Sequence, residues 1–170
     1  SNAGGNQLSP TWDSLRASGP SNQRFNSASS PLFLSRNSDY VIPVFKSCFI
    51  RPGTSCAGDK LGEANLSGAN LSDMDFTGAN LQRARLVGAT LNNPNFTDAF
   101  LKGAVFSGAT GANTQLGARS LADANFSRVR LENPKATGTS FLRSNWTKAY
   151  VEKGDFSSSN FYKSNFFGAN

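Results

Sequence analysis

The sequence has no histidine, only two cysteines, one methionine and no long apolar run. Without histidine, the chain lacks the commonest general base and metal ligand, which excludes a Ser/His/Asp or Cys/His triad and any histidine-containing zinc site. Two cysteines are too few for a four-cysteine zinc site or a ferredoxin-type iron–sulfur cluster. No apolar run approaches the ~20 residues that a membrane-spanning helix needs. We therefore expect no catalytic residues, no metal site, no cofactor and no membrane span.

The net charge of +6 is divided evenly along the chain. Residues 1–58 carry five basic and two acidic side chains, and residues 59–170 carry twelve and nine. No Lys/Arg block typical of a nucleic-acid surface is present. The charge indicates a mildly basic surface, and weak attraction to nucleic acid or to an anionic membrane is the alternative interpretation.

The first 58 residues differ in character from the rest. Residues 1–3 resemble the remnant of a cleaved expression tag. The native protein could therefore begin with a targeting peptide that this sequence does not include. Residues 4–39 are rich in Ser, Asn, Gly and Pro without any period, so we expect a flexible or draped extension. Residues 40–58 begin with the most apolar stretch of the chain, which Pro43 confines to an edge strand or an extended cover. We interpret residues 40–58 as an N-terminal cap.

From Leu61 onward, a large apolar residue recurs at every fifth position. Twenty of the twenty-two positions in this register are Leu, Phe, Trp or Val, whereas an apolar content of 38% predicts about eight. Gly111 and Ala136 are the two departures, and most residues two positions before each centre are small. A period of five fits neither the 3.6 of a helix nor the 2.0 of a flat strand. The predicted core ladder is Leu61, Leu66, Leu71, Phe76, Leu81, Leu86, Leu91, Phe96, Leu101, Phe106, Leu116, Leu121, Phe126, Leu131, Phe141, Trp146, Val151, Phe156, Phe161 and Phe166.

If each centre and the small residue before it point inward, every five-residue unit must turn the chain through about a right angle. Four units then make a coil of about twenty residues, and the coils stack at the ~4.8 Å spacing of neighbouring strands. Backbone groups bond to the coils above and below. The period therefore predicts an all-β solenoid of about five and a half coils over residues 59–170, with an irregular N-terminal extension.

Units such as Ala64-Asn65-Leu66-Ser67-Gly68 and Ala79-Asn80-Leu81-Gln82-Arg83 strongly resemble the A(D/N)LXX consensus of pentapeptide repeat proteins. The resemblance covers residues 59–170 and implies the right-handed quadrilateral β-helix of that family. Arg119 stands at a small-residue position and Gly111 at a repeat centre, which predicts a local bulge. A functional cleft at this point is the alternative hypothesis.

The resemblance leaves two hypotheses of function. The first is a non-catalytic scaffold or protein–protein interaction module with an unidentified protein partner. The second comes from the branch of the family that mimics the DNA duplex and inhibits or protects DNA gyrase. Such mimicry needs a strongly acidic face, because the partner's surface is built to neutralise phosphates. The basic excess of residues 59–170 therefore favours the first hypothesis.

The two cysteines, Cys48 and Cys56, lie just before the regular repeats. A disulfide between them would hold the apolar segment against the open first coil and cover its strand edges. It would contribute about 2 kcal/mol and favour a periplasmic or lumenal location. Two buried free thiols in a reducing cytosol are the alternative.

Apolar residues also occupy outward positions near the end of the sequence: Leu142, Tyr150, Tyr162 and Phe167. An exposed apolar cluster beside an open sheet edge is an association surface unless something covers it. Family members dimerise through C-terminal aromatic coils, so the resemblance implies a homodimer through this end. Continuation of the native chain past Asn170 is the competing explanation.

Overall fold

The computed structural model describes residues 32–33, 43–44 and 48–170. The predicted tag remnant, most of the predicted extension at 4–39 and most of the apolar stretch up to residue 47 lie outside the described residues. Within them, strand β1 (Leu32–Phe33) pairs antiparallel with β2 (Pro43–Val44), and Leu32 lies opposite Val44.

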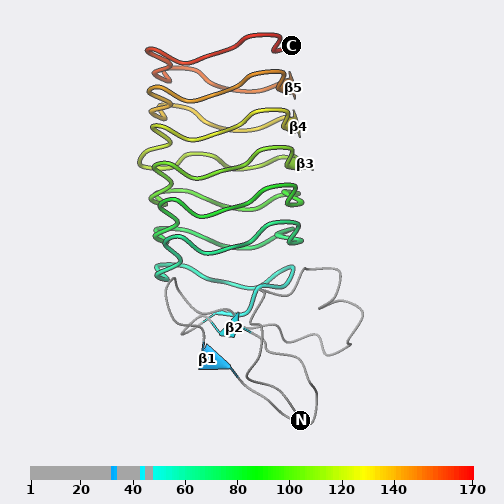
Figure 1. Cartoon of the computed structure of the whole chain (residues 1–170), viewed down its shortest axis with the longest axis vertical. Helices are drawn as coiled ribbons and strands as arrows, with labels where there is room; N and C mark the ends of the chain where they lie inside the picture. The colour runs from blue at the N-terminus through cyan, green and yellow to red at the C-terminus, as the bar shows by residue number, and fades with distance from the viewer. Residues whose placement is uncertain (1–31, 34–42, 45–47) are drawn as a thin grey trace, which may run out of the picture.

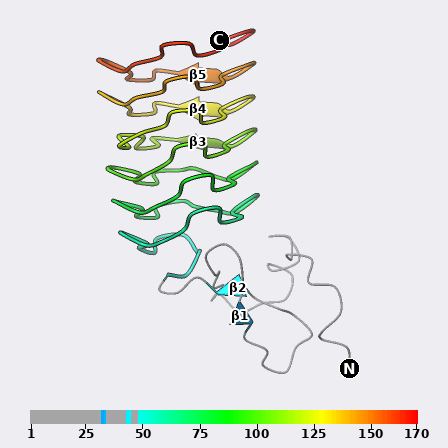
Figure 2. The ribbon, with the colours of Figure 1, turned by 60° about the vertical axis from the view of Figure 1, so that its left-hand side comes forward.

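From residue 55 onward, nearly every outward bridging residue pairs in parallel with the residue twenty positions later, beginning with Ser55 and Asp75. Strands β3 (Thr110–Ala112), β4 (Arg130–Glu132) and β5 (Tyr150–Glu152) form a parallel sheet in that order. Figures 1 and 2 show the resulting stack of coils, which ends at the C-terminus. The described residues contain strands, bridges and turns but no helix. The five-residue period thus produces a β-helix, as the sequence predicts.

Backbone hydrogen bonds join each coil to both of its neighbours. The backbone N–H of Leu61 donates to the Asn80 carbonyl at 2.7 Å, and the backbone N–H of Asn80 donates to the Asp59 carbonyl at 2.8 Å. The same two bonds recur along the stack, so each coil supplies the partners that its neighbour's backbone requires.

The repeat centres fill the axis of the stack. The centres up to Trp146 are buried except Gly111, together with the alanines two positions before them. Towards the C-terminus the axis becomes aromatic, and the rings of Phe106, Phe126 and Trp146 stack with centroid separations of 4.7 and 4.3 Å. Such stacking adds to the free energy gained by burying the rings.

The last repeat centre departs from the predicted core ladder. Val151, Phe156 and Phe161 are half-buried, and Phe166 is 47% exposed. The prediction that Phe166 is a core residue is therefore wrong in this structure. Its ring stacks on Trp146 below, at 6.3 Å between centroids, but the described chain places no coil above it.

Corner positions impose a left-handed backbone. The residue two positions after each centre has a positive φ in nearly every unit, for example 70° at Gly68 and 57° at Arg83. Glycine adopts this conformation without a steric penalty, whereas a residue with a Cβ does so at a cost.

One proline in the stack is compensated by a hydroxyl group from the next coil. In regular units the small residue donates its N–H to the preceding centre's carbonyl, as Ala89 does to Leu86 at 3.1 Å. Pro94 has no N–H to give to the Leu91 carbonyl. The buried Thr114 donates its Oγ1–H to that oxygen instead, at 2.8 Å.

Gly111 lies against the backbone of the coil below it. A Cβ built on Gly111 would lie 2.8 Å from Leu91 Cα and closer still to the carbonyl of Leu91. No side chain fits at this repeat centre. The absence of a large apolar residue at position 111 therefore has a steric cause.

Arg119 lies outside the small-residue corner that its sequence position assigns to it. Ala118 occupies the buried place, and the N–H of Arg119 donates to the Ala99 carbonyl at 3.0 Å. In the coil below, the equivalent bond to Ala79 comes from Phe100, which would correspond to residue 120. The backbone is thus shifted by one residue, and the Arg119 guanidinium lies over the Phe100 ring at 5.1 Å.

We predict that Gly111→Ala lowers the free energy of unfolding by at least about 2 kcal/mol, because the new methyl group must displace the backbone of Leu91. Gly117→Ala is the matched control, since the nearest atom to a Cβ there is Thr97 Oγ1 at 4.0 Å. The control should stay within about 0.5 kcal/mol of the unmutated protein. Chemical denaturation measures both, and equal stability of the two variants would contradict the steric explanation.

Candidate functional site

The lower end of the stack is closed by a covalent link. Cys48 and Cys56 form a disulfide, and both are buried at 2% and 0% exposure. Cys48 and Ile50 belong to the same core cluster as the first repeat centres. The link therefore holds residues 48–50 against the apolar axis of the first coil.

Among the described residues, one group of potential metal ligands comes close together: Cys48, Cys56 and Asp59, whose ligand atoms lie within 4.8 Å of one another. The two sulfur atoms are bonded to each other, so neither is a thiolate. A metal ligand must be deprotonated and free, which this arrangement does not provide.

The upper end of the stack has an apolar hollow of about 450 Å³. Its walls are the last repeat centres and small residues, and it is lined by Trp146, Ala149, Val151, Gly154, Phe156, Phe161, Phe166, Ala169 and Asn170. No titratable side chain lines it, so the hollow offers apolar contact and no acid–base chemistry.

The four predicted interface residues do not form one cluster. Leu142 and Tyr162 stand in one column, separated by one coil, and Tyr162 is 63% exposed. Phe167 is 73% exposed on the next side of the stack, beside this column. Tyr150 lies in β5, where the Arg130 guanidinium lies over its ring at 5.7 Å. Leu142 and Tyr162 thus share one side of the stack, whereas Tyr150 and Phe167 lie on two other sides.

One outward column is a hydrogen-bonding ladder, and other outward side chains form hydrogen bonds within their own turn. Asn93 donates its amide N–H to Asp73 at 2.9 Å, Asn113 donates to Asn93, and Asn133 donates to Asn113 at 2.7 Å. The carboxylates of Asp75 and Asp155 accept hydrogen bonds from Thr77 and Ser157, which lower the pKa of each. A lowered pKa means that these carboxylates stabilise the folded state at neutral pH, and that this contribution is lost as the pH falls.

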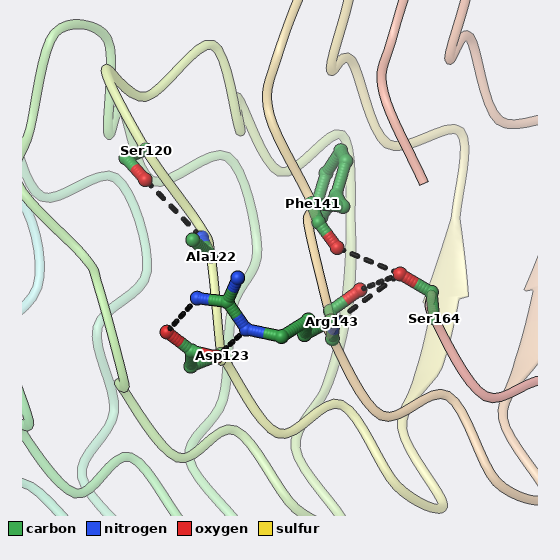
Figure 3. Close-up of polar contacts among 7 residues, drawn as sticks. Ser120, Ala122, Asp123, Phe141, Arg143 and Ser164 are labelled. Carbon is green, nitrogen blue, oxygen red and sulfur yellow. Dashed lines mark hydrogen bonds and ion pairs between the residues drawn. The ribbon is translucent and has the colours of Figure 1, made fainter. Parts of the chain in front are cut away.

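Among the described residues, the shortest ion pair joins adjacent coils. Figure 3 shows the Arg143 guanidinium against the Asp123 carboxylate, with N–H···O distances of 2.7 and 2.9 Å. Hydrogen bonding to Arg143 lowers the pKa of Asp123. In the same view, the Ser164 hydroxyl donates to the Phe141 carbonyl at 2.7 Å, which ties the last coil to the one below.

One side of the stack carries most of the basic excess, and we call it the amide face. It consists of residues 63–68, 83–88, 103–108, 123–128, 143–148 and 163–168, from one corner column to the next. It has six basic and two acidic side chains, whereas the remainder of residues 59–170 has six and seven. Sequence analysis by single columns misses this asymmetry, and summing the charges over whole five-residue faces would have found it.

Comparison with protein families matches pentapeptide repeats, in eight copies, to residues 60–93 and 124–161. None of the curated proteins compared with the chain matches it significantly.

The similar solved structures include three of interest. HetL, a pentapeptide repeat protein involved in heterocyst differentiation regulation from the cyanobacterium Nostoc sp. strain PCC 7120, is 21% identical over 68% of this chain and 63% of its own, with a TM-score of 0.49. A pentapeptide repeat protein from the Arabidopsis thaliana thylakoid lumen is 22% identical over 70% and 62%, with a TM-score of 0.37. QnrB1, a plasmid-mediated fluoroquinolone resistance protein, is 18% identical over 68% and 78%, with a TM-score of 0.41. The chain thus spans less than two thirds of the length of the first two.

We predict that the unreduced, denatured protein contains no titratable thiol, because the two cysteines are bonded to each other. Replacing both with serine should lower the free energy of unfolding by about 2 kcal/mol, since the short loop is no longer closed in the unfolded chain. Thiol titration and chemical denaturation measure these effects. Two free thiols per chain would show that the bond is absent in solution.

Proposed function

The chain belongs to the pentapeptide repeat family, and we propose that it is a non-catalytic scaffold that presents a rigid side of its β-helix to a protein partner. In this proposal the rod is right-handed, has about five and a half coils and begins near residue 59. Its N-terminal cap comprises residues 40–58, and the extension at 4–39 precedes it.

The observation that carries the proposal is the division between an apolar interior and a polar exterior. Most side chains in the stack that are fully buried are apolar, and the described residues leave no buried side-chain polar atom without a partner. Polar and charged groups lie outside, in columns fixed by a hydrogen-bonded backbone. A surface whose side chains are held in a regular array favours recognition, because little conformational freedom is lost on binding.

The gyrase alternative requires a face that resembles a polyanion. The described β-helix has no such acidic side, since the amide face has a net charge of +4 and the remaining sides together are close to neutral. A surface that substitutes for DNA phosphates must be acidic over most of its length. The charge distribution therefore supports the protein-interaction proposal over duplex mimicry.

The proposal includes self-association through the C-terminal end. The exposed Phe166 lines the apolar hollow there, and Tyr162 and Phe167 are further exposed rings of the same last coil. A second copy placed end to end would cover these rings and the open edge of the last coil.

To test the interaction function, a photo-reactive benzoylphenylalanine would replace one outward residue on each side of the rod, at Gln82, Asn92, Thr137 or Thr147. Irradiation in an extract of the source organism should yield a protein adduct of one defined mass from one side and not from the opposite side. Samples kept in the dark are the control. Absence of a protein adduct from all four positions would contradict the proposal.

Light scattering tests self-association of the 18.1 kDa chain. We predict twice this mass at tens of micromolar protein, and a monomer for the variant with both Tyr162→Lys and Phe167→Lys, because the lysines place charge in the apolar contact. Phe100→Lys is the matched control, since Phe100 is an exposed ring on the side of the rod, at 38% exposure. A monomeric mass for the unmutated protein would end this part of the proposal.

A further inference from the structure

The amide face leaves most of its cations without an acidic partner. Arg83 pairs with Glu63 at 3.6 Å and Arg143 pairs with Asp123, which accounts for both acidic residues of the face. The other four basic side chains are exposed and form no ion pair with a described residue: Arg85, Arg128, Lys148 and Lys163. Among them, the ammonium group of Lys163 lies 5.3 Å from the centre of the Tyr162 ring.

Two of these cations occupy positions where the fold prefers glycine. Arg128 and Lys148 stand at corners with φ of 57° and 56°. The other coils have glycine at the same corner, namely Gly68, Gly88, Gly108 and Gly168. A side chain at a left-handed corner is less favourable than glycine there. Neither cation offsets this conformational cost by forming an ion pair with a described residue. Their placement therefore indicates a function other than stabilising the fold.

Between the two corner columns runs a column that carries asparagine in four of its six positions, and in its last three coils the amide groups have a fixed orientation. The Oδ1 atoms of Asn125, Asn145 and Asn165 accept hydrogen bonds from the backbone N–H groups two residues later, at 2.9, 3.0 and 3.0 Å. Because a backbone N–H can only donate, the oxygen must face it and the NH₂ group must point the other way. These NH₂ groups have no hydrogen-bond acceptor among the described residues. The column therefore adds donors to a face that is already cationic.

We infer that the amide face binds an extended acidic segment of the protein partner; this inference rests on the proposed interaction function. Carboxylate groups accept from guanidinium, ammonium and amide donors, which are the groups that this face presents. The face already holds one carboxylate in this way, since Arg143 donates to both oxygens of Asp123. Arg128 and Lys148 stand one coil apart, about 4.8 Å, so neighbouring acidic side chains reach both.

The number of unpaired cations argues against a nucleic acid as the partner. Proteins whose binding to DNA depends steeply on salt neutralise on the order of six to ten phosphates. The amide face offers four cations without an acidic partner, which is fewer than such proteins use. The face also lacks a row of aromatic rings on which single-stranded bases stack, since its exposed aromatic side chains, Phe166 and Phe167, both lie in the last coil.

The test measures binding of a fluorescein-labelled peptide of about twelve residues that alternates Glu and Ser, by fluorescence anisotropy at low and high salt. The key variant combines Arg128→Gly and Lys148→Gly, which gives these corners the residue that the other coils have and so preserves the fold. The matched control combines Lys60→Gln and Lys135→Gln, which removes the same charge from other sides of the rod. Oligo-dT of equal charge and vesicles containing phosphatidylserine are tested in parallel.

The expected result is salt-sensitive binding of the peptide, weakened at least about tenfold by the glycine variant and less than threefold by the control. Equal weakening by both variants would show a net-charge effect and overturn the inference. So would the absence of peptide binding, or tighter binding of oligo-dT or vesicles than of the peptide. If photo-adducts form from another side of the rod while the peptide fails to bind, the interaction function stands and this assignment of the surface falls.

Discussion

The parallel pairing of outward residues twenty positions apart is the constraint on which the described stack depends. It fixes the length of every coil, because one inserted residue would displace all later side chains from their columns. It also fixes the interior, since only one large and one small side chain per five residues fit inside so narrow a coil. Corners must then turn within two residues, which requires the left-handed backbone found at nearly every unit.

Where the chain departs from this pattern, the neighbouring coil supplies the correction. Pro94 cannot donate to Leu91, and Thr114 does so from the coil above. The close approach of Gly111 occurs against the same residue, Leu91. These departures fall between residues 93 and 124, where the family match is interrupted. The bridges nevertheless continue through this region, for example between Asn95 and Gln115. The backbone pairing is therefore less sensitive to composition than the sequence consensus is.

The sequence predicts the β-helix well because the interior imposes a single rule at every fifth residue, and twenty of twenty-two positions obey it. Details that depend on the neighbouring coil are harder to predict. Phe166 has the sequence of a core residue but lacks a coil above it. Arg119 leaves its corner because the backbone shifts by one residue and Ala118 takes the buried place. Neither outcome follows from the local sequence, since both depend on contacts between residues about twenty positions apart.

The charge asymmetry illustrates the same limit for the candidate site. Arg85, Arg128, Lys148 and Lys163 are far apart in sequence and form no basic block, yet the twenty-residue coil brings them onto one side. In a fold whose interior and backbone are already satisfied, outward side chains are released from most structural requirements. The informative positions are then those where the fold has a preference and the residue opposes it. A corner that has glycine in other coils and arginine or lysine here is such a position. The charge forms no ion pair within the described β-helix, but it adds to the positive charge of the amide face.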